Sequence, residues 1–195
     1  NCDLRGMAYN KRLFGEAGLD PSQPPDDWEE LRSATRKLTR LDQDGVVVRG
    51  ADIGPSAHNF FWFLRQAGIT EIDEVSLTSN LNRPEALEAV STMVDIAEIA
   101  HRRDPFPGVD SGIAGFAQGR IGMAIHQPNH LKQVMNINAD ITDQYGVYAP
   151  RSRAGVPRVS HGFINGLAIT SASRNKDLAW ALIEALHDED VLRKG

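Results

Sequence analysis

Cysteine is nearly absent from this chain of 195 residues, which has Cys2 as its one cysteine. A single cysteine excludes an internal disulfide and a cysteine-ligated metal cluster. A cysteine near a chain start can carry the lipid of a bacterial lipoprotein, but no apolar segment precedes Cys2, so its position does not favour lipidation there. The compartment is left open, since many exported bacterial proteins contain no disulfide.

Long apolar runs are lacking as well. No segment approaches the roughly 18 consecutive apolar residues of a membrane-spanning helix. The sequence also begins without a recognisable secretory leader. This indicates a cytoplasmic protein, an exported protein whose leader has been removed, or a piece of a longer chain.

An excess of basic charge is missing too. The net charge is −5, and 24% of the residues are charged against 41% that are hydrophobic, which is the balance of an ordinary globular protein. Lysine and arginine form no stripe along an expected helix face. The composition therefore predicts no binding to nucleic acid and no electrostatic binding to an anionic membrane surface.

The sequence contains no GxSxG elbow, no phosphate-binding GxxxxGK[ST] loop, no HExxH and no GxGxxG. His126 and His130 stand four residues apart, a spacing that can hold zinc on a helix face. Pro128 lies between them, however, and no carboxylate is placed as a third ligand, which favours polar or cleft-lining histidines. We predict no catalytic residue, no metal and no cofactor. The absence of a recognisable catalytic motif favours a binding protein over an enzyme.

Hydrophobic periodicity, capping residues and turns predict an alternation of strands and helices, which is typical of a layered α/β fold. Asp26 and Glu29 form the expected capping pair of a helix whose core-facing stripe is expected at Trp28, Leu31, Thr35 and Leu38. Pro84 starts the clearest helix, whose buried face is expected at Ala86, Leu87, Val90, Met93, Val94 and Ala97. The helices are expected over 8–19, 26–42, 58–68, 81–103, 112–119, 129–136 and 173–192, and the strands over 46–54, 121–126, 144–150 and 161–170.

Five segments resemble, in order and spacing, the bacterial extracellular solute-binding proteins that serve ABC importers, in the carbohydrate-binding group that includes maltodextrin-binding protein. The most specific is AYNKRLFGEAGLDPSQPPDDWEELRSATRKLT, which is similar to the family's YNKdLF…AGL…TWdEL stretch. The others are NFFWFLRQAG, RPEALEAVSTMVDI, AGFAQGRIGMAIHQPNHL and HGFINGLAITSASRNKDLAWALIEAL. Together they cover the chain from about residue 8 to 192.

This resemblance implies a periplasmic-binding-protein-like (type II) lobe with a mixed central sheet flanked by helices. Family members are roughly twice as long, so residues 1–160 would be the second lobe, 161–170 a strand that crosses the hinge, and 171–195 a helix that packs on a first lobe. The implied function is capture of a sugar or similar polar solute between two lobes and delivery to an ABC permease. The implied location is the periplasm or the extracellular face of a bacterial membrane, with any lipid anchor outside these residues.

The resemblance also places the candidate ligand-binding residues. Sugars need planar polar side chains for paired hydrogen bonds and aromatic faces for stacking. Phe60, with His58 and Asn59, starts a helix where the family has cleft aromatics, although core packing is an equal alternative for Phe60. His161 and Gly162, with Asn165 as a further candidate, lie where the chain crosses the hinge.

Gln127 and Asn129 end an apolar strand where the family has a glycine and a stacking tryptophan. An amide can hydrogen-bond a hydroxyl group but cannot stack like an indole, so a smaller or more polar solute than a maltodextrin is expected. The alternative for Asn129 is capping of the next helix. Two other functions stay open, namely a hydrolase-type enzyme and a ligand-sensing module built on the same lobe.

Overall fold

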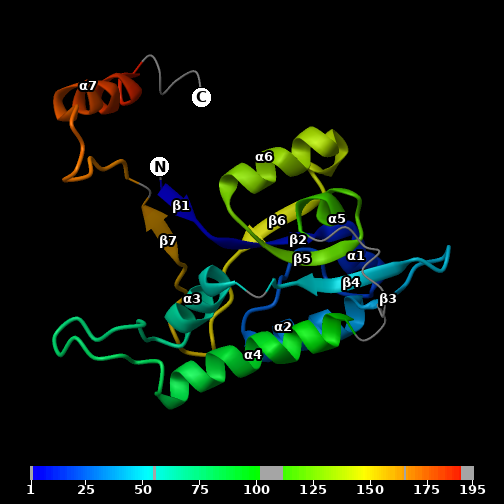
Figure 1. Ribbon diagram of the computed structural model, residues 1–195. Coiled ribbons are helices and arrows are strands. Elements are labelled where there is room, and N and C mark those ends of the chain that lie inside the picture. The colour runs from blue at the N-terminus through cyan, green and yellow to red at the C-terminus, as the bar shows by residue number, and fades with distance from the viewer. Residues whose placement is uncertain (1, 55, 102–111, 165, 190–195) are drawn as a thin grey trace. The chain divides into compact units, whose positions relative to one another are not determined.

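The computed structural model describes residues 2–54, 56–101, 112–164 and 166–189 (Figure 1). The chain divides into two compact units, and the larger one runs from Asp3 to Gly162. The smaller unit contains the chain from Phe163 onwards with the first two residues. The division falls inside β7 (Gly162–Ile164), which pairs with β1 (Cys2–Leu4) in a two-stranded sheet.

The larger unit is built on a five-stranded mixed sheet in the order β3-β4-β5-β2-β6. Strands β4 and β5 are parallel, whereas β2 runs antiparallel to its neighbours β5 and β6. The predicted α/β fold with a mixed central sheet is confirmed. The strands are β2 (Gly6–Asn10), β3 (Arg40–Leu41), β4 (Val47–Asp52), β5 (Ile121–His126) and β6 (Tyr145–Tyr148).

Helices cover both faces of this sheet (Figure 1). Helices α2, α3 and α4 pack on one face, and α5 and α6 lie over the other. Within the described residues, none of the helices combines the length and the apolar character that crossing a membrane requires. The helices are α1 (Lys11–Glu16), α2 (Trp28–Leu38), α3 (Ala57–Gln66), α4 (Pro84–His101), α5 (Ile113–Ala117), α6 (Pro128–Ile137), the short 3-10 helix η1 (Ala139–Ile141) and α7 (Lys176–Leu186).

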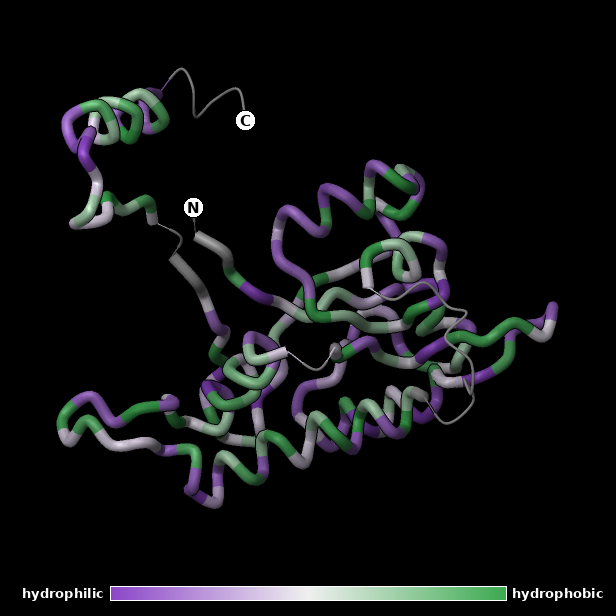
Figure 2. Tube along the Cα trace, viewed as in Figure 1, coloured by the Kyte–Doolittle hydropathy of each residue, from purple (hydrophilic) through white to green (hydrophobic). Residues whose placement is uncertain are grey.

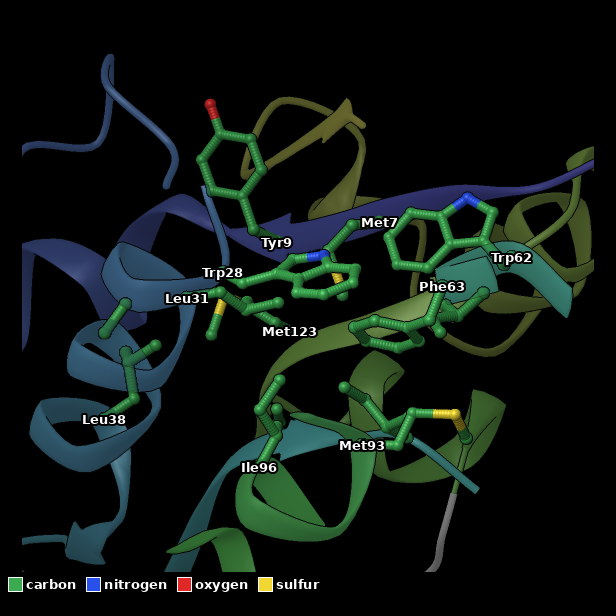
Figure 3. Packing of buried hydrophobic residues seen from close by; sticks show 14 of the residues in the cluster. Met7, Tyr9, Trp28, Leu31, Leu38, Trp62, Phe63, Met93, Ile96 and Met123 are labelled. Atoms are coloured by element: carbon green, nitrogen blue, oxygen red, sulfur yellow. The ribbon is translucent and has the colours of Figure 1, made fainter. Parts of the chain in front are cut away.

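The central strand β5 is buried along its whole length. Met123 and Ile125 join the cluster under α2, α3 and α4, while Ile121 and Ala124 join the cluster under α5 and α6. A strand covered on both faces has no solvent side, which explains its continuous apolar run. Figure 3 shows Met123 among the large side chains of the first cluster.

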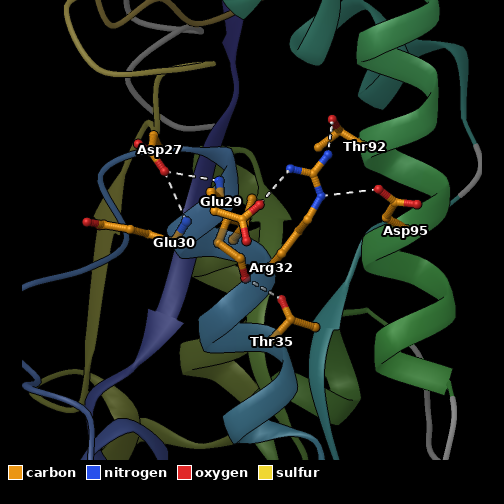
Figure 4. Close-up of polar contacts among 8 residues, drawn as sticks. Asp27, Glu29, Glu30, Arg32, Thr35, Thr92 and Asp95 are labelled. Atoms are coloured by element: carbon orange, nitrogen blue, oxygen red, sulfur yellow. Dashed lines mark hydrogen bonds and ion pairs between the residues drawn. The ribbon is translucent and has the colours of Figure 1, made fainter.

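Helix α2 begins one residue later than the Asp26 cap predicts. The cap is Asp27, whose side chain accepts hydrogen bonds from the backbone N–H groups of Glu29 and Glu30, both at 3.0 Å. Figure 4 shows that Arg32, on the next turn, reaches across to α4 and donates to Asp95 at 3.2 Å. These contacts fix where α2 starts and how it lies against α4.

The predicted buried face of α4 is partly right, because Ala86 and Met93 are buried as expected. Leu87, Val90 and Val94 are exposed. The buried residues recur at spacings of three and four and face α2, α3 and β4, so a row of alanine, methionine and isoleucine side chains fills this contact, and the leucine and the valines face outward. The buried residues are Ala86, Ala89, Thr92, Met93, Ile96, Ile99 and Ala100.

The smaller unit consists mainly of α7. The strand predicted over 161–170 is limited to β7, and 166–170 has no regular structure. Residue Asn165, one of the hinge candidates, lies outside the described residues. Figure 2 shows hydrophobic segments along α7, and no residue of this helix is buried.

Candidate functional site

Polar side chains gather at one edge of the five-stranded sheet. Strands β4 and β5 are parallel neighbours, so their carboxyl ends, Asp52 and His126, reach the same edge. Strand β2 is antiparallel to β5 and pairs Gly6 with His126, which brings the start of β2 and the preceding Arg5 to this edge as well. In open α/β sheets, ligands bind beyond the carboxyl ends of the strands.

The edge carries a cleft of about 280 Å³. Helix α3 follows β4, and α6 follows β5, so the N-termini of both helices also point to this edge of the sheet. Half of the ten lining residues carry polar side chains, and backbone at Gly54 and Gly112 forms part of the wall. The lining residues are Arg5, Asp52, Gly54, Asn59, Gly112, Ile113, Ala124, Ile125, His126 and His130.

Hydrogen bonds hold Asn59 and Asp52 in place in the cleft wall. The Asn59 side chain donates to the Gly54 carbonyl at 2.9 Å and accepts from Nη1 of Arg5 at 3.3 Å. The Asp52 carboxylate accepts from the Gly112 N–H at 2.5 Å, and its other oxygen lies 3.9 Å from Nη1 of the buried Arg49. The charge of Asp52 is therefore balanced, and the wall is preorganised before a ligand arrives.

His126 is the most deeply buried titratable side chain of the cleft lining, with 4% of its surface exposed. Its ring packs edge-on against Phe116 at 5.1 Å and against His130 at 5.7 Å between centroids. Burial first, and then the nearby charge of His130, lowers the pKa of His126 from 6.5 to about 4. The imidazole is therefore neutral near pH 7, with one nitrogen as donor and the other as acceptor.

The two histidines do not form part of a metal-ligand set. Among the described residues, no three His, Cys, Asp or Glu side chains gather closely enough to hold a metal ion. The Nε2 atoms of His130 and Gln127 lie 3.0 Å apart, at hydrogen-bond distance. This contact spans the first turn of α6, at the mouth of the cleft.

The predicted residues on α3 and α6 lie at the same edge of the sheet. Asn59 lines the cleft, and His58 is exposed beside it in the first turn of α3. Gln127 is the N-cap residue of α6 and Asn129 is exposed in its first turn, so the alternative that Asn129 caps this helix is wrong. Phe60 is half-buried and packs against the core under α3.

His161 and Gly162 lie just before the division of the chain. His161 is buried, its carbonyl accepts from the N–H of Arg5 at 3.0 Å, and its ring lies 5.9 Å from that of Phe61. Burial and then the charge of Arg65 lower the pKa of His161. Gly162 is exposed at the start of β7. Neither residue lines the cleft. His161 is connected to it by the hydrogen bond from the backbone of Arg5, which does line the cleft.

Sequence reasoning missed Arg5 and Asp52, and it named His126 and His130 only as general lining histidines. Each of these residues lies next to or at a strand end, or in the first turn of a helix. A polar residue at such a place in the sequence is the signal that could have marked it as part of a cleft. That signal is ambiguous for Arg5, because a residue before a strand reaches the ligand edge only when the strand is antiparallel to the parallel pair. The direction of β2 is a property of the sheet and not of the local sequence.

A mixed α/β lobe with a polar cleft at the strand ends defines the class of lobe found in periplasmic-type binding proteins. The family model of bacterial extracellular solute-binding proteins matches residues 2–191, and the chain belongs to this family. A curated binding protein of Brucella abortus (strain 2308) is 28% identical over 193 residues, covering 95% of this chain and 45% of the relative. The sn-glycerol-3-phosphate-binding periplasmic protein UgpB of Yersinia pestis is 60% identical over 32 residues, which are 16% of this chain and 7% of UgpB.

Solved structures give the same result for the fold. An ABC transporter solute-binding protein from Thermotoga lettingae TMO, bound with α-D-tagatose, is 28% identical with a TM-score of 0.78 over 99% of this chain and 50% of that one. A solute-binding protein from Agrobacterium radiobacter K84 in complex with ribitol is 22% identical with a TM-score of 0.75 over 99% of this chain and 49% of that one. The chain thus spans about half the length of the proteins it matches.

Proposed function

We propose that this chain is part of the substrate-binding component of an ABC importer, which captures a small sugar or polyol and delivers it to a membrane permease. The polar cleft at the strand ends is the observation that carries the proposal. The family assignment and the similarity to the tagatose-bound protein support it. Neither a hydrolase nor a sensing module is favoured by a specific observation.

The side chains of the cleft suit the hydroxyl groups of such a solute. Arg5, Asp52 and Asn59 offer planar groups that can form paired hydrogen bonds. No phenylalanine, tyrosine or tryptophan is among the described residues that line the cleft, so a long sugar chain lacks a stacking platform here. A monosaccharide or an acyclic polyol fits this wall better than a maltodextrin does.

Binding would close two lobes on the solute. In this proposal residues 1–160 form the second lobe, 161–170 cross the hinge, and the helix after residue 171 packs on a first lobe. The apolar residues of α7 support the last step, because Leu178, Leu182 and Leu186 have no buried environment in the described structure. A solute that contacts both lobes shifts the population towards the closed form, which the permease would recognise at the periplasmic or extracellular face.

The proposed ligand-binding residues combine the cleft wall with a rim of residues around it. Asn59 was predicted to bind the ligand, and it lines the cleft. The rim consists of His58, Phe60, Gln127 and Asn129 at the starts of α3 and α6, with His161 and Gly162 at the approach to the hinge.

Isothermal titration of the complete protein tests the proposal. The panel contains D-tagatose, ribitol, D-mannitol, mannobiose and sn-glycerol 3-phosphate, and we expect heat with at least one of the uncharged single-unit compounds. The variant Asn129→Ala should weaken binding about fivefold to tenfold, the cost of one hydrogen bond. Asn136→Ala removes the same group from the other end of α6, where it is exposed, and should leave binding unchanged. A complete protein that gives no heat with any carbohydrate or polyol would contradict the proposed function.

A further inference from the structure

The cleft contains one buried polar group whose hydrogen bonds are missing. Neither Nδ1 nor Nε2 of His126 has a hydrogen-bond partner among the described residues, although only 4% of the side chain is exposed. Buried polar atoms are nearly always paired in folded proteins, since leaving one unpaired costs its full desolvation. An unpaired imidazole at the end of the central strand therefore calls for a physical explanation.

Among the described residues, the surroundings of His126 point to the cleft as the place where a partner can lie. Phe116, at 5.1 Å between ring centroids, is apolar and cannot satisfy the ring nitrogens. The other polar groups of the wall already have partners within the protein, as Asp52 bonds to Gly112 and Asn59 bonds to Gly54. His126 thus adds hydrogen-bonding capacity that no contact within the described residues uses.

Resting on the proposed function, we propose that His126 contacts the ligand and sets its class, by hydrogen-bonding a hydroxyl group of an uncharged polyol or monosaccharide. A neutral imidazole has one donor and one acceptor, and a hydroxyl group can meet either. A phosphate or carboxylate only accepts and an ammonium only donates, so a charged group would use one nitrogen at most. Neighbouring hydroxyl groups of a polyol match both.

The structure also indicates how a solute reaches the ring. Both nitrogens of His126 are shielded from solvent, so a neighbouring side chain has to move before contact is made. His130 is half-exposed in the first turn of α6 and packs edge-on against His126 at 5.7 Å. Its contact with Gln127, a predicted ligand-binding residue, links its position to the rim of the cleft. In this proposal, rotation of His130 would open the path to His126.

Three variants of the complete protein test this inference, with ribitol, D-tagatose, D-mannitol and sn-glycerol 3-phosphate as the probes in calorimetry. His126→Phe keeps the flat ring and removes both nitrogens. His126→Gln keeps a donor and an acceptor near the position of Nε2. Ile121→Val is the control, because it lies on β5 at the end away from the cleft and is fully buried.

We expect His126→Phe to weaken binding of the uncharged probe by about tenfold or more, while its Tm stays equal or rises because a desolvated polar group is gone. His126→Gln should recover part of the affinity, and Ile121→Val should lower the Tm slightly without changing the Kd. An unchanged Kd in His126→Phe, with normal binding by the unmodified protein, would overturn the inference and leave the proposed function standing. So would tight binding of sn-glycerol 3-phosphate alone. If the unmodified protein binds no carbohydrate or polyol at all, the proposed function falls as well, which separates the two failures.

Discussion

Replacing His126 should flatten the pH dependence of stability in the larger unit. Burial lowers the pKa of this imidazole from 6.5 to about 4, so the folded protein holds it neutral where the unfolded chain protonates it. The unfolded state therefore binds more protons between these two values, and stability falls as the pH drops through this window. Well above pH 6.5 the ring is neutral in both the folded and the unfolded state, so its titration no longer changes the stability.

The magnitude follows from the same two values. A pKa gap from 6.5 to about 4, at about 1.4 kcal/mol per unit, corresponds to about 3 kcal/mol. Between pH 7.5 and pH 5, where the folded ring is still largely neutral, about 2 kcal/mol of this is lost. The groups that face the ring, His130 on α6 and Arg5 and Asp52 at the sheet edge, are present in both proteins, so they largely cancel in the comparison.

The assay is urea unfolding at pH 7.5 and at pH 5, followed by tryptophan fluorescence. Trp28 and Trp62 are both buried in the larger unit and report on its unfolding. We expect the original protein to lose about 2 kcal/mol more than His126→Phe does over this interval. His58→Phe removes an exposed imidazole from α3 and should behave like the original protein. Equal losses in the original protein and in His126→Phe would refute the reasoning.

Two further substitutions test the fold that holds the site. Asp27→Ala should lower the free energy of unfolding by about 1 kcal/mol in urea titrations, because two N–H groups of α2 lose their cap. Asp27→Asn should cost little, since asparagine caps as well. Equal effects of the two substitutions would contradict the capping argument. Gly50→Ala places a Cβ 2.2 Å from the Thr35 carbonyl, where β4 meets α2, and should cost about 3 kcal/mol or prevent folding. Gly166→Ala, whose Cβ meets no atom of the described residues within 4 Å, is its control. A Tm of Gly50→Ala close to that of Gly166→Ala would show that the contact at Gly50 is not tight.

Local patterns predicted most elements of this protein because their causes are local. The apolar run at Ile121–His126 is a buried strand, and the stripe of Trp28, Leu31, Thr35 and Leu38 is the buried face of α2. The cap of α2 was misplaced by one residue, since Asp26 and Asp27 are chemically equivalent as caps and only backbone geometry separates them. The family resemblance, now confirmed by the family match, rests on the same ordered local segments.

The sequence by itself determined the α/β alternation, the family and the presence of polar side chains at the starts of α3 and α6. Tertiary structure alone decided that Leu87 and Val90 face outward, because the contacts of α4 with α2, α3 and β4 select which of its apolar residues are covered. It also decided that Arg5, Asp52 and His126 meet in one cleft. That meeting depends on the order and direction of strands far apart in the chain, and strand pairing is a long-range interaction that no short segment encodes.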